Sequence, residues 1–301
     1  MNDSDCLIIG GGIAGLQAAV QLGRYQHNVT VIDKGYGRST LCRSYHNILG
    51  WPDGVSGDQL RALGRMQAER LGVRFINDEA LRAVQVDSGF EVTLRSGASL
   101  RSSKLLLATG VLDRFPPLPG LEQCLGLTIY VCPDCDGYEV SGRRTIVLGS
   151  GDAGARMALT LTYWTDRIVY VNHECQPVSG DLIHKLEERQ IPKIDAPIAA
   201  VQTKGEGRFT GLHLADGRTV PGERGFIAFG GNEVLSDLAQ QLGVERLENR
   251  HIITNPRTME TNIRGVYAAG DVAVHAEQVT VAMGEGSLAA IWIHKALIGV
   301  G

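Results

Sequence analysis

The sequence has no long apolar run and no large excess of charge of one sign. Its 301 residues include 29 Lys and Arg against 33 Asp and Glu, a formal net charge of −4. This balance offers no basic field for nucleic acid or an anionic membrane, and no run is long enough to cross a bilayer. The start, Met1–Asp5, is acidic where a secretory signal is basic. We therefore expect a cytoplasmic protein without nucleic-acid or membrane partners.

Aromatic residues are also scarce, at 6% of the chain, whereas glycine is abundant, with 38 residues. Many glycines with few aromatics are typical of an α/β protein in which tight turns join strands to helices. The length is sufficient for two domains, each with its own core. The composition therefore predicts an α/β fold of two domains.

Cysteines are few, and only two of the six lie close together. Cys132 and Cys135 are separated by two residues, which in a reducing compartment is typical of a catalytic disulfide. The remaining cysteines are expected to be reduced: Cys6, Cys42, Cys124 and Cys175. The alternatives are a zinc half-site or two idle thiols, but zinc needs a second ligand pair, and none occurs at the usual spacing. No metal site is expected.

A first glycine fingerprint lies near the N-terminus. Residues 6–33 predict a strand, a turn with Gly10, Gly12 and Gly15, a helix, and a second strand that ends at Asp33. In this context the glycines let the backbone approach a pyrophosphate, the helix N-terminus favours its charge, and the acid can bind a ribose. The sequence therefore predicts a dinucleotide site. Its other expected members are Ile13, Ala14 and Lys34.

A second fingerprint repeats this pattern shortly after the cysteine pair, with Gly149, Gly151 and Gly154. Its second strand is followed by Glu174, where an acid contacts a ribose 2′-hydroxyl. No Lys or Arg occurs from residue 168 to 183, so we expect nothing nearby to neutralise this carboxylate against a 2′-phosphate. The site is predicted to take a dinucleotide with a free 2′-hydroxyl, NAD(H) or a second FAD. Its other expected members are Asp152 and Ala153.

Several other segments have recognisable patterns. Residues 35–57 are predicted to form a cofactor-wrapping loop, with a plain surface connection as the alternative, and residues 58–71 a helix capped by Asp58. Residues 211–220 predict a hairpin, and residues 235–242 a short helix or a linker.

Proline and glycine also mark the domain limits and the C-terminal part. Three prolines in Phe115–Gly120 predict a domain boundary. Later, Gly265–Ala269 predicts a strand, and Gly270-Asp271 follows it. The helix predicted over residues 280–298 then places its N-terminus near Asp271, which suits a ribityl hydroxyl and an electron-rich ring edge.

In this order, the motifs resemble the low-molecular-weight thioredoxin reductase family. The resemblance covers nearly the whole chain, from the first fingerprint through Cys132-x-x-Cys135-Asp136-Gly137 to Gly270-Asp271. It implies two Rossmann-like dinucleotide-binding domains of the three-layer ββα type, the second inserted into the first. The FAD-binding domain would comprise residues 1–117 and 242–301, and residues 118–241 would form the second domain, carrying the disulfide. It also implies a homodimer.

The resemblance assigns roles to individual residues. Cys135 resembles the thiol that exchanges electrons with the flavin, Cys132 the thiol that attacks the partner disulfide, and Asp136 the acid that protonates the leaving thiolate. These roles agree with thiol chemistry, in which the thiolate is the nucleophile. Further FAD contacts are implied for His46, Asn47, Thr109, Gly110, Gly270, Asp271, Gln278 and Val279.

Three departures from the family concern the electron donor. His173-Glu174-Cys175 stands where the family has the His-Arg-Arg motif of its NADPH site, and Glu277-Gln278 where an Arg-Gln pair is usual. The loop Cys42–Asn47 is closer to relatives that oxidise dithiols or do not use pyridine nucleotide. We therefore predict weak or no use of NADPH, with NADH, a second flavin or a ferredoxin-type carrier protein as donor.

The interpretation that follows is an FAD-dependent oxidoreductase. It would move electrons between flavin and the Cys132–Cys135 disulfide, and on to a thioredoxin-like protein or another disulfide substrate. One alternative is a flavin dithiol oxidase that forms disulfides in a peptide or small molecule. Another is a flavoprotein redox sensor without turnover.

Overall fold

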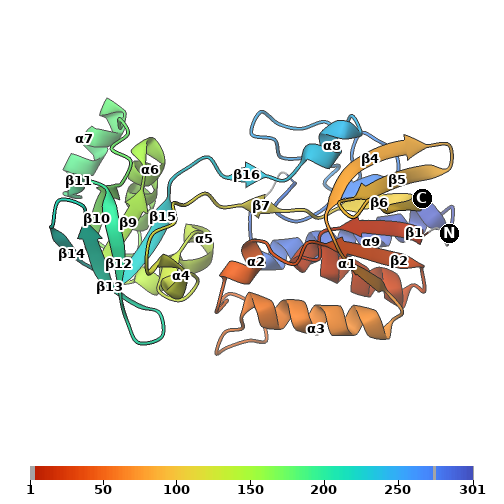
Figure 1. The fold of residues 1–301 in the computed structure, drawn as a ribbon, viewed down its shortest axis with the longest axis horizontal. Coiled ribbons are helices and arrows are strands. Elements are labelled where there is room, and N and C mark those ends of the chain that lie inside the picture. The colour runs from red at the N-terminus through yellow and green to blue at the C-terminus, as the bar shows by residue number, and fades with distance from the viewer. Residues whose placement is uncertain (1–3, 274–275, 301) are drawn as a thin grey trace. The chain divides into compact units, whose positions relative to one another are not determined.

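The computed structural model describes residues 4–273 and 276–300. The chain forms two compact units: unit 1 comprises Met1–Thr40, Ser56–Leu112 and Glu233–Gly301, and unit 2 comprises Leu41–Val55 and Asp113–Asn232. In Figure 1 the red, orange and blue elements belong mainly to unit 1, and the yellow-green to teal elements to unit 2. The units are defined by packing alone, so the predicted domain limits and their ligands stay a prediction.

Unit 1 is built on a seven-stranded sheet. Its parallel strands are β3 (Arg74–Asn77), β2 (Val29–Asp33), β1 (Ser4–Ile9), β6 (Ser99–Leu107) and β17 (Val266–Ala268). Two antiparallel strands, β5 (Gly89–Leu94) and β4 (Ala80–Val86), extend it beyond β6. Strands of such a parallel sheet are covered on both faces, which explains why β1 is almost entirely buried.

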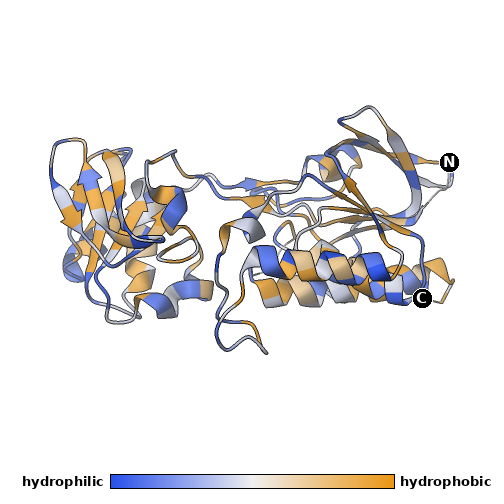
Figure 2. Ribbon diagram, turned by 60° about the horizontal axis from the view of Figure 1, so that its bottom comes forward, coloured by the Kyte–Doolittle hydropathy of each residue, from blue (hydrophilic) through white to orange (hydrophobic). Residues whose placement is uncertain are grey.

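Three long helices accompany this sheet: α1 (Ile13–Arg24), α3 (Gly57–Arg70) and α9 (Val279–Leu297). Helix α1 packs against both α3 and α9. The close approach of α9 requires Gly286, because a Cβ there would overlap the Ala14 carbonyl. In Figure 2 the long helices carry both hydrophobic and hydrophilic residues, and the buried residues of α1 include Leu16, Ala19 and Leu22, as expected for a helix with one buried face.

Unit 2 has a five-stranded parallel sheet of its own. Its order is β11 (Lys193–Asp195), β10 (Ile168–Asn172), β9 (Thr145–Gly149), β15 (Arg224–Ala228) and β8 (Ile129–Tyr130). A three-stranded antiparallel sheet consists of β12 (Ile198–Lys204), β13 (Arg208–Leu214) and β14 (Thr219–Pro221). The helices α6 (Gly151–Leu161) and α7 (Gly180–Glu188) complete the layers.

The remaining elements are short. They are α2 (Arg38–Leu41), α4 (Leu121–Cys124), α5 (Pro133–Asp136), the 3-10 helix η1 (Gly137–Val140), α8 (Asp237–Gln241), and the strand pair β7 (Val111–Leu112) and β16 (Glu233–Val234). Among the described residues, none of the helices combines the length and apolar character that a membrane crossing requires.

Most of the predicted elements are confirmed, including the two βαβ units, the hairpin with Gly217 at φ 89° and the last helix. The cap predicted for α3 was wrong. Ser56, not Asp58, precedes the helix, and its hydroxyl accepts the Gln59 N–H. The loop expected over residues 35–57 is interrupted by α2.

Candidate active site: a disulfide and two glycine fingerprints

Cys132 and Cys135 form the disulfide that their spacing predicts. Cys132 is extended and precedes α5, and Pro133 occupies the first helical position, where its missing N–H costs nothing. The amides of Cys135 and Asp136 both donate to the Cys132 carbonyl, at 3.2 and 3.0 Å. This single helical turn brings the two α-carbons within 5.3 Å, so the ring can close without distorting the rest of unit 2.

Asp136 follows the disulfide directly and has an unusual environment. Burial, together with the nearby charge of Glu139, raises the pKa of its carboxyl to about 7. Near neutral pH the side chain is therefore divided between its protonated and ionised forms, as general acid catalysis requires. Its predicted role as acid stays a prediction, but its environment is suited to that role.

The loop around Cys42 lies in unit 2. Burial and the charge of Asp136 raise the pKa of the Cys42 thiol to about 12, so this cysteine remains a neutral thiol. His46 faces Glu139, with 3.3 Å between Nδ1 and Oε1, and hydrogen-bonds Ser44. Asn47 is exposed. The structure thus places His46 beside the carboxylate that raises the pKa of Asp136.

The first fingerprint forms a turn that leaves open space at the N-terminus of α1. Gly10 has φ 108°, and a Cβ there would overlap the Ala108 carbonyl, while a Cβ at Gly15 would overlap the carbonyl of Gly10. A Cβ at Gly12 would meet no described atom within 4 Å. The first turn of α1 contains no acid, and its first amides, starting at Ile13, have no acceptor within the helix. These features fit the pyrophosphate of a dinucleotide.

Asp33 lies directly over this turn. A Cβ at Gly11 would come within 2.6 Å of its Oδ2 atom, so the fold needs glycine at position 11 as well as at position 10, and sequence reasoning did not single out Gly11. Arg61 of α3 donates to the same carboxylate at 2.9 Å. Lys34 extends over the ring of Tyr36, at 4.5 Å from its centroid. Asp33 thus pairs with a cation that the sequence pattern did not reveal, and its contact with a ribose stays a prediction.

Gly270 joins the C-terminal strand to this fingerprint. It has φ 80°, and a Cβ would lie 2.9 Å from the Ala14 Cβ. Its amide donates to Glu285 of α9 at 2.8 Å. Gln278 is the N-cap of α9 and Val279 its first residue. The predicted FAD residues of the C-terminal part therefore lie beside those of the first fingerprint.

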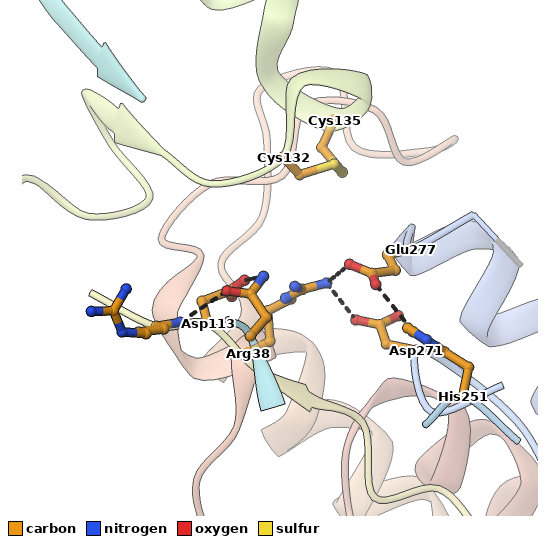
Figure 3. A network of polar contacts seen from close by, with 9 residues as sticks. Arg38, Asp113, Cys132, Cys135, His251, Asp271 and Glu277 are labelled. Atoms are coloured by element: carbon orange, nitrogen blue, oxygen red, sulfur yellow. Dashed lines mark hydrogen bonds and ion pairs between the residues drawn. A yellow bond between two sulfur atoms is a disulfide. The ribbon is translucent and has the colours of Figure 1, made fainter. Parts of the chain in front are cut away.

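An ion-pair network surrounds Asp271, as Figure 3 shows. Arg38 of α2 donates to Asp271 at 3.1 Å and also to Glu277. His251 lies 3.5 Å from Glu277, between Nε2 and Oε1. Sequence reasoning noted Glu277 as a departure from the family but missed Arg38. The positive charge that the family pattern carries next to Gln278 is present here, but on a different segment.

Thr109 and Gly110 both hydrogen-bond the backbone of Leu235, in the segment where the chain returns from unit 2 to unit 1. The Thr109 hydroxyl donates to the Leu235 carbonyl, and Gly110, with φ 72°, accepts the Leu235 amide at 3.0 Å. Their observed role is therefore structural, and their predicted contact with FAD stays a prediction.

The glycines of the second fingerprint contact side chains of unit 2 itself. Gly154 is required because a Cβ there would overlap the ring of Tyr170. The Gly151 amide donates to the buried Asn172 at 3.0 Å, and its carbonyl accepts the Tyr170 hydroxyl at 2.8 Å. Gly149 is pressed against Gly154, since a Cβ would lie 2.8 Å from that Cα. These glycines therefore serve internal packing.

An acid lies in the first turn of the helix that follows the second fingerprint. Asp152, in the first turn of α6, accepts the Ser179 amide at 2.7 Å and lies 3.6 Å from Arg156. Ala153 lies nearby, close to where a Gly230 Cβ would be. A carboxylate at the helix N-terminus occupies the place that favours a phosphate. The second turn is thus a poorer anion site than the first.

The expectation that nothing neutralises Glu174 was wrong. Arg114, 60 residues away in sequence, donates to the Glu174 carboxylate. A hydrogen bond with Ser150 and the pair with Arg114 both lower the pKa of Glu174. Arg114 also donates to the Phe229 carbonyl at 3.2 Å, and its amide to Asn232 at 3.0 Å. Sequence reasoning looked for a cation only in residues 168–183, whereas Arg114 lies at the start of the segment Asp113–Asn232.

His173 also has a structural partner. Its Nδ1 accepts the Ile198 amide at 2.7 Å, and burial lowers its pKa. It therefore stays neutral near pH 7 and brings no positive charge to the second site.

Residues 4–286 match the pyridine nucleotide-disulphide oxidoreductase family. The chain belongs to this family. It is 31% identical to thioredoxin reductase aclD of Aspergillus oryzae, over 96% of this chain and 95% of that protein. It is 29% identical to the thioredoxin reductase of Treponema pallidum, again over 96% and 95%. The predicted resemblance is confirmed.

Solved structures agree. HlmI has a TM-score of 0.86 and 30% identity, covering 99% of this chain and 93% of its own. The thioredoxin reductase of Streptococcus pyogenes has a TM-score of 0.87 at 24% identity, with 98% of each chain covered, which shows the fold alone. The chain is a thioredoxin reductase-like flavin disulfide oxidoreductase with two Rossmann-like domains.

Proposed function

We propose that this enzyme moves electrons between FAD and the Cys132–Cys135 pair, and then to the disulfide of a thioredoxin-like protein. The observation that carries the proposal is the disulfide followed directly by an acid whose pKa lies near 7. Several relatives are named thioredoxin reductases, which favours a protein partner. We also propose that the protein is cytoplasmic and forms a homodimer. Light scattering on the purified protein can check the dimer.

FAD would be held in unit 1. The residues that fit it are Gly10, Gly12, Ile13, Ala14, Gly15, Asp33, Gly270, Asp271, Gln278 and Val279. When bound, FAD supplies a two-electron couple for the disulfide. Arg38 neutralises the carboxylates of Asp271 and Glu277, so the site need not carry two uncompensated acids.

The exchange with the partner follows from thiol chemistry. The thiolate of reduced Cys132 attacks one sulfur of the partner disulfide, and the other partner sulfur leaves and takes a proton from Asp136. The Cys135 thiolate then attacks the Cys132 sulfur, which releases the second partner sulfur and re-forms the ring. One disulfide is reduced and one is formed, so the electrons balance.

Unit 2 offers apolar surface next to this ring. Tyr138 follows the redox motif and is 79% exposed, and Tyr163 is 84% exposed. The two belong to one neighbourhood, because Gly137 packs against Trp164, whose ring contacts Tyr163. Exposed aromatic side chains are typical of protein interfaces, and here they favour a protein-sized disulfide substrate.

The electron donor is proposed to be other than NADPH. A 2′-phosphate at the second fingerprint would face Glu174, while Arg114 is already committed to that carboxylate. Asp152 adds a second negative charge at the helix N-terminus. NADH, a second FAD or a ferredoxin-type carrier remain the candidates. Stopped-flow reduction of the flavin by NADPH and NADH, each at micromolar concentration, tests this, and rapid reduction by NADPH would contradict it.

The central experiment compares the parent enzyme with Cys135→Ser and Cys42→Ser. Insulin reduction through a thioredoxin should be lost in Cys135→Ser, because the ring can no longer form, and kept in Cys42→Ser, whose thiol stays protonated. Parent-level turnover by Cys135→Ser would refute the proposed electron path. Oxygen uptake that requires an added dithiol would instead favour a dithiol oxidase.

A further inference from the structure

A basic cavity lies on unit 2, away from the residues discussed above. Its volume is about 540 Å³, within the range of small-ligand sites. The side chains that line it include Thr128, Arg143, Arg144, Arg208, Glu223 and Arg224. Four of these six are arginines, which neither the redox ring nor the second fingerprint uses.

The strand order separates this cavity from the second fingerprint. Thr128 precedes β8, Arg144 precedes β9, and Arg224 begins β15. These strands are parallel, so their amino ends share one edge of the sheet. The fingerprint follows the carboxyl end of β9, five residues further along, which corresponds to about 16 Å of extended chain. The cavity and the fingerprint therefore lie at opposite edges.

The cavity carries a large excess of positive charge. Glu223 is its one carboxylate among the lining residues, and it lies 3.5 Å from Arg143 and 4.0 Å from Arg167. It also accepts the Arg144 amide at 3.0 Å. Four guanidinium groups against one carboxylate leave a formal charge of +3 on the lining, in a protein whose net charge is −4.

Several of these donors have no protein acceptor. In residues 4–273 and 276–300, the guanidinium groups of Arg144 and Arg208 make no hydrogen bond or ion pair. Arg224 donates through Nη1 to the Glu223 carbonyl at 3.0 Å, but its buried Nε finds no acceptor in the same ranges. The Arg224 Nε is itself inaccessible, so the donors that can reach a ligand in the cavity are the exposed guanidinium groups of Arg144 and Arg208.

We propose that this cavity binds a small molecule through a phosphate or diphosphate group. The planar fork of arginine matches phosphate oxygens in pairs, and four arginines line this one cavity. A carrier of two or more negative charges would offset the excess, which a single carboxylate would not. Because the cavity lies at the edge opposite the second fingerprint, its ligand is distinct from any dinucleotide there.

Calorimetry on the purified, flavin-loaded protein tests the proposal, with inorganic pyrophosphate and ADP as probes. Binding should weaken at least tenfold in Arg144→Gln/Arg208→Gln, both of which are exposed side chains. Thr210→Glu, which adds a carboxylate to the cavity lining, should weaken it similarly. Arg189→Gln removes an exposed arginine outside the lining and is the matched control. Melting temperatures establish that each variant is folded.

A further variant separates the two edges. Glu174→Gln alters the second fingerprint, so it should leave pyrophosphate binding at the cavity unchanged. The proposal is overturned if neither probe binds at millimolar concentration, or if the double arginine variant binds like the parent protein. It is also overturned if Glu174→Gln, and not the arginine variant, changes the affinity, or if this face binds an acidic protein but no small anion.

Discussion

The two glycine fingerprints have nearly the same sequence pattern but different surroundings. In unit 1 the turn opens onto free space at Gly12, and the first turn of α1 has no acid. In unit 2 the amide of Gly151 is committed to Asn172, and Asp152 stands at the helix N-terminus. The comparison teaches that the glycine pattern specifies a strand-turn-helix connection, whereas the neighbouring side chains determine whether the turn can bind a phosphate.

The largest effect is expected from Gly12→Val. This backbone position has an ordinary extended conformation, and the added side chain meets only open space, so the fold should be retained. The same space is where the pyrophosphate would lie, so FAD should be lost and the purified protein colourless. Gly180→Val, at the start of α7 with equally open space, is the control and should stay yellow. A yellow Gly12→Val protein would show that the first turn does not bind the cofactor.

Asp136→Asn should lower the rate of disulfide exchange by about 10²- to 10⁴-fold, the usual contribution of a general acid. In the parent enzyme the exchange rate should fall as the pH rises above about 7, where Asp136 loses its proton. Glu139→Gln removes one cause of the raised pKa, so this fall should move to lower pH. A pH profile identical in Glu139→Gln and parent would contradict the assignment.

Unfolding experiments give an independent measure of the same pKa. The folded-state pKa of Asp136 is raised from 3.8 to about 7, so its contribution to stability is fully present below pH 3.8 and is lost as the pH rises through 7. Asp136→Asn should therefore stabilise the protein at pH 8 by at most about 4 kcal/mol, and much less at pH 5. Denaturant unfolding at both pH values is the test, and equal effects would contradict it.

Gly154→Ala separates packing from ligand binding at the second fingerprint. The new Cβ overlaps the ring of Tyr170, and overpacking of this kind costs about 1–3 kcal/mol. The free energy of unfolding should fall accordingly, while the flavin spectrum of unit 1 is unchanged. The double variant Gly154→Ala/Tyr170→Leu replaces the ring by a smaller side chain, so it should recover part of the lost free energy of unfolding. No recovery would mean that the ring is not the obstacle.

The smallest effect is expected from Glu174→Gln. It removes the charge that faces a 2′-phosphate and releases Arg114, so the ratio of NADPH to NADH reactivity should rise, by roughly tenfold or less. Stopped-flow reduction of the flavin measures this ratio. Arg114→Gln should change it in the opposite direction, and a ratio unaffected by either variant would mean that this pair does not face a nicotinamide dinucleotide.

The sequence was a good guide where the determinants are local. Both βαβ units, the disulfide and the last helix follow from glycine, apolar spacing and a pair of cysteines. It failed where partners come from distant segments, because Arg38, Arg61 and Arg114 reach Asp271, Asp33 and Glu174 only through the tertiary fold.

Short or irregular elements were the other difficulty. Helix α7 and strand β12 were not predicted, although Ser179 precedes α7 as its N-cap and Asp181 lies in its first turn, and Asp58 was chosen as the cap of α3 where Ser56, two residues earlier, is the cap. Gly11 was overlooked because the fingerprint allows any residue there, although Asp33 leaves room for glycine alone.

Anaerobic titration with dithionite tests most directly that a flavin in this protein shares electrons with the Cys132–Cys135 ring. A flavin and a disulfide each take two electrons, so the parent protein should take up about two more electrons per chain than Cys135→Ser. Adding an oxidised thioredoxin should then reoxidise the flavin in the parent protein only. Equal uptake by the two proteins, or a parent protein that contains no flavin, would contradict the account.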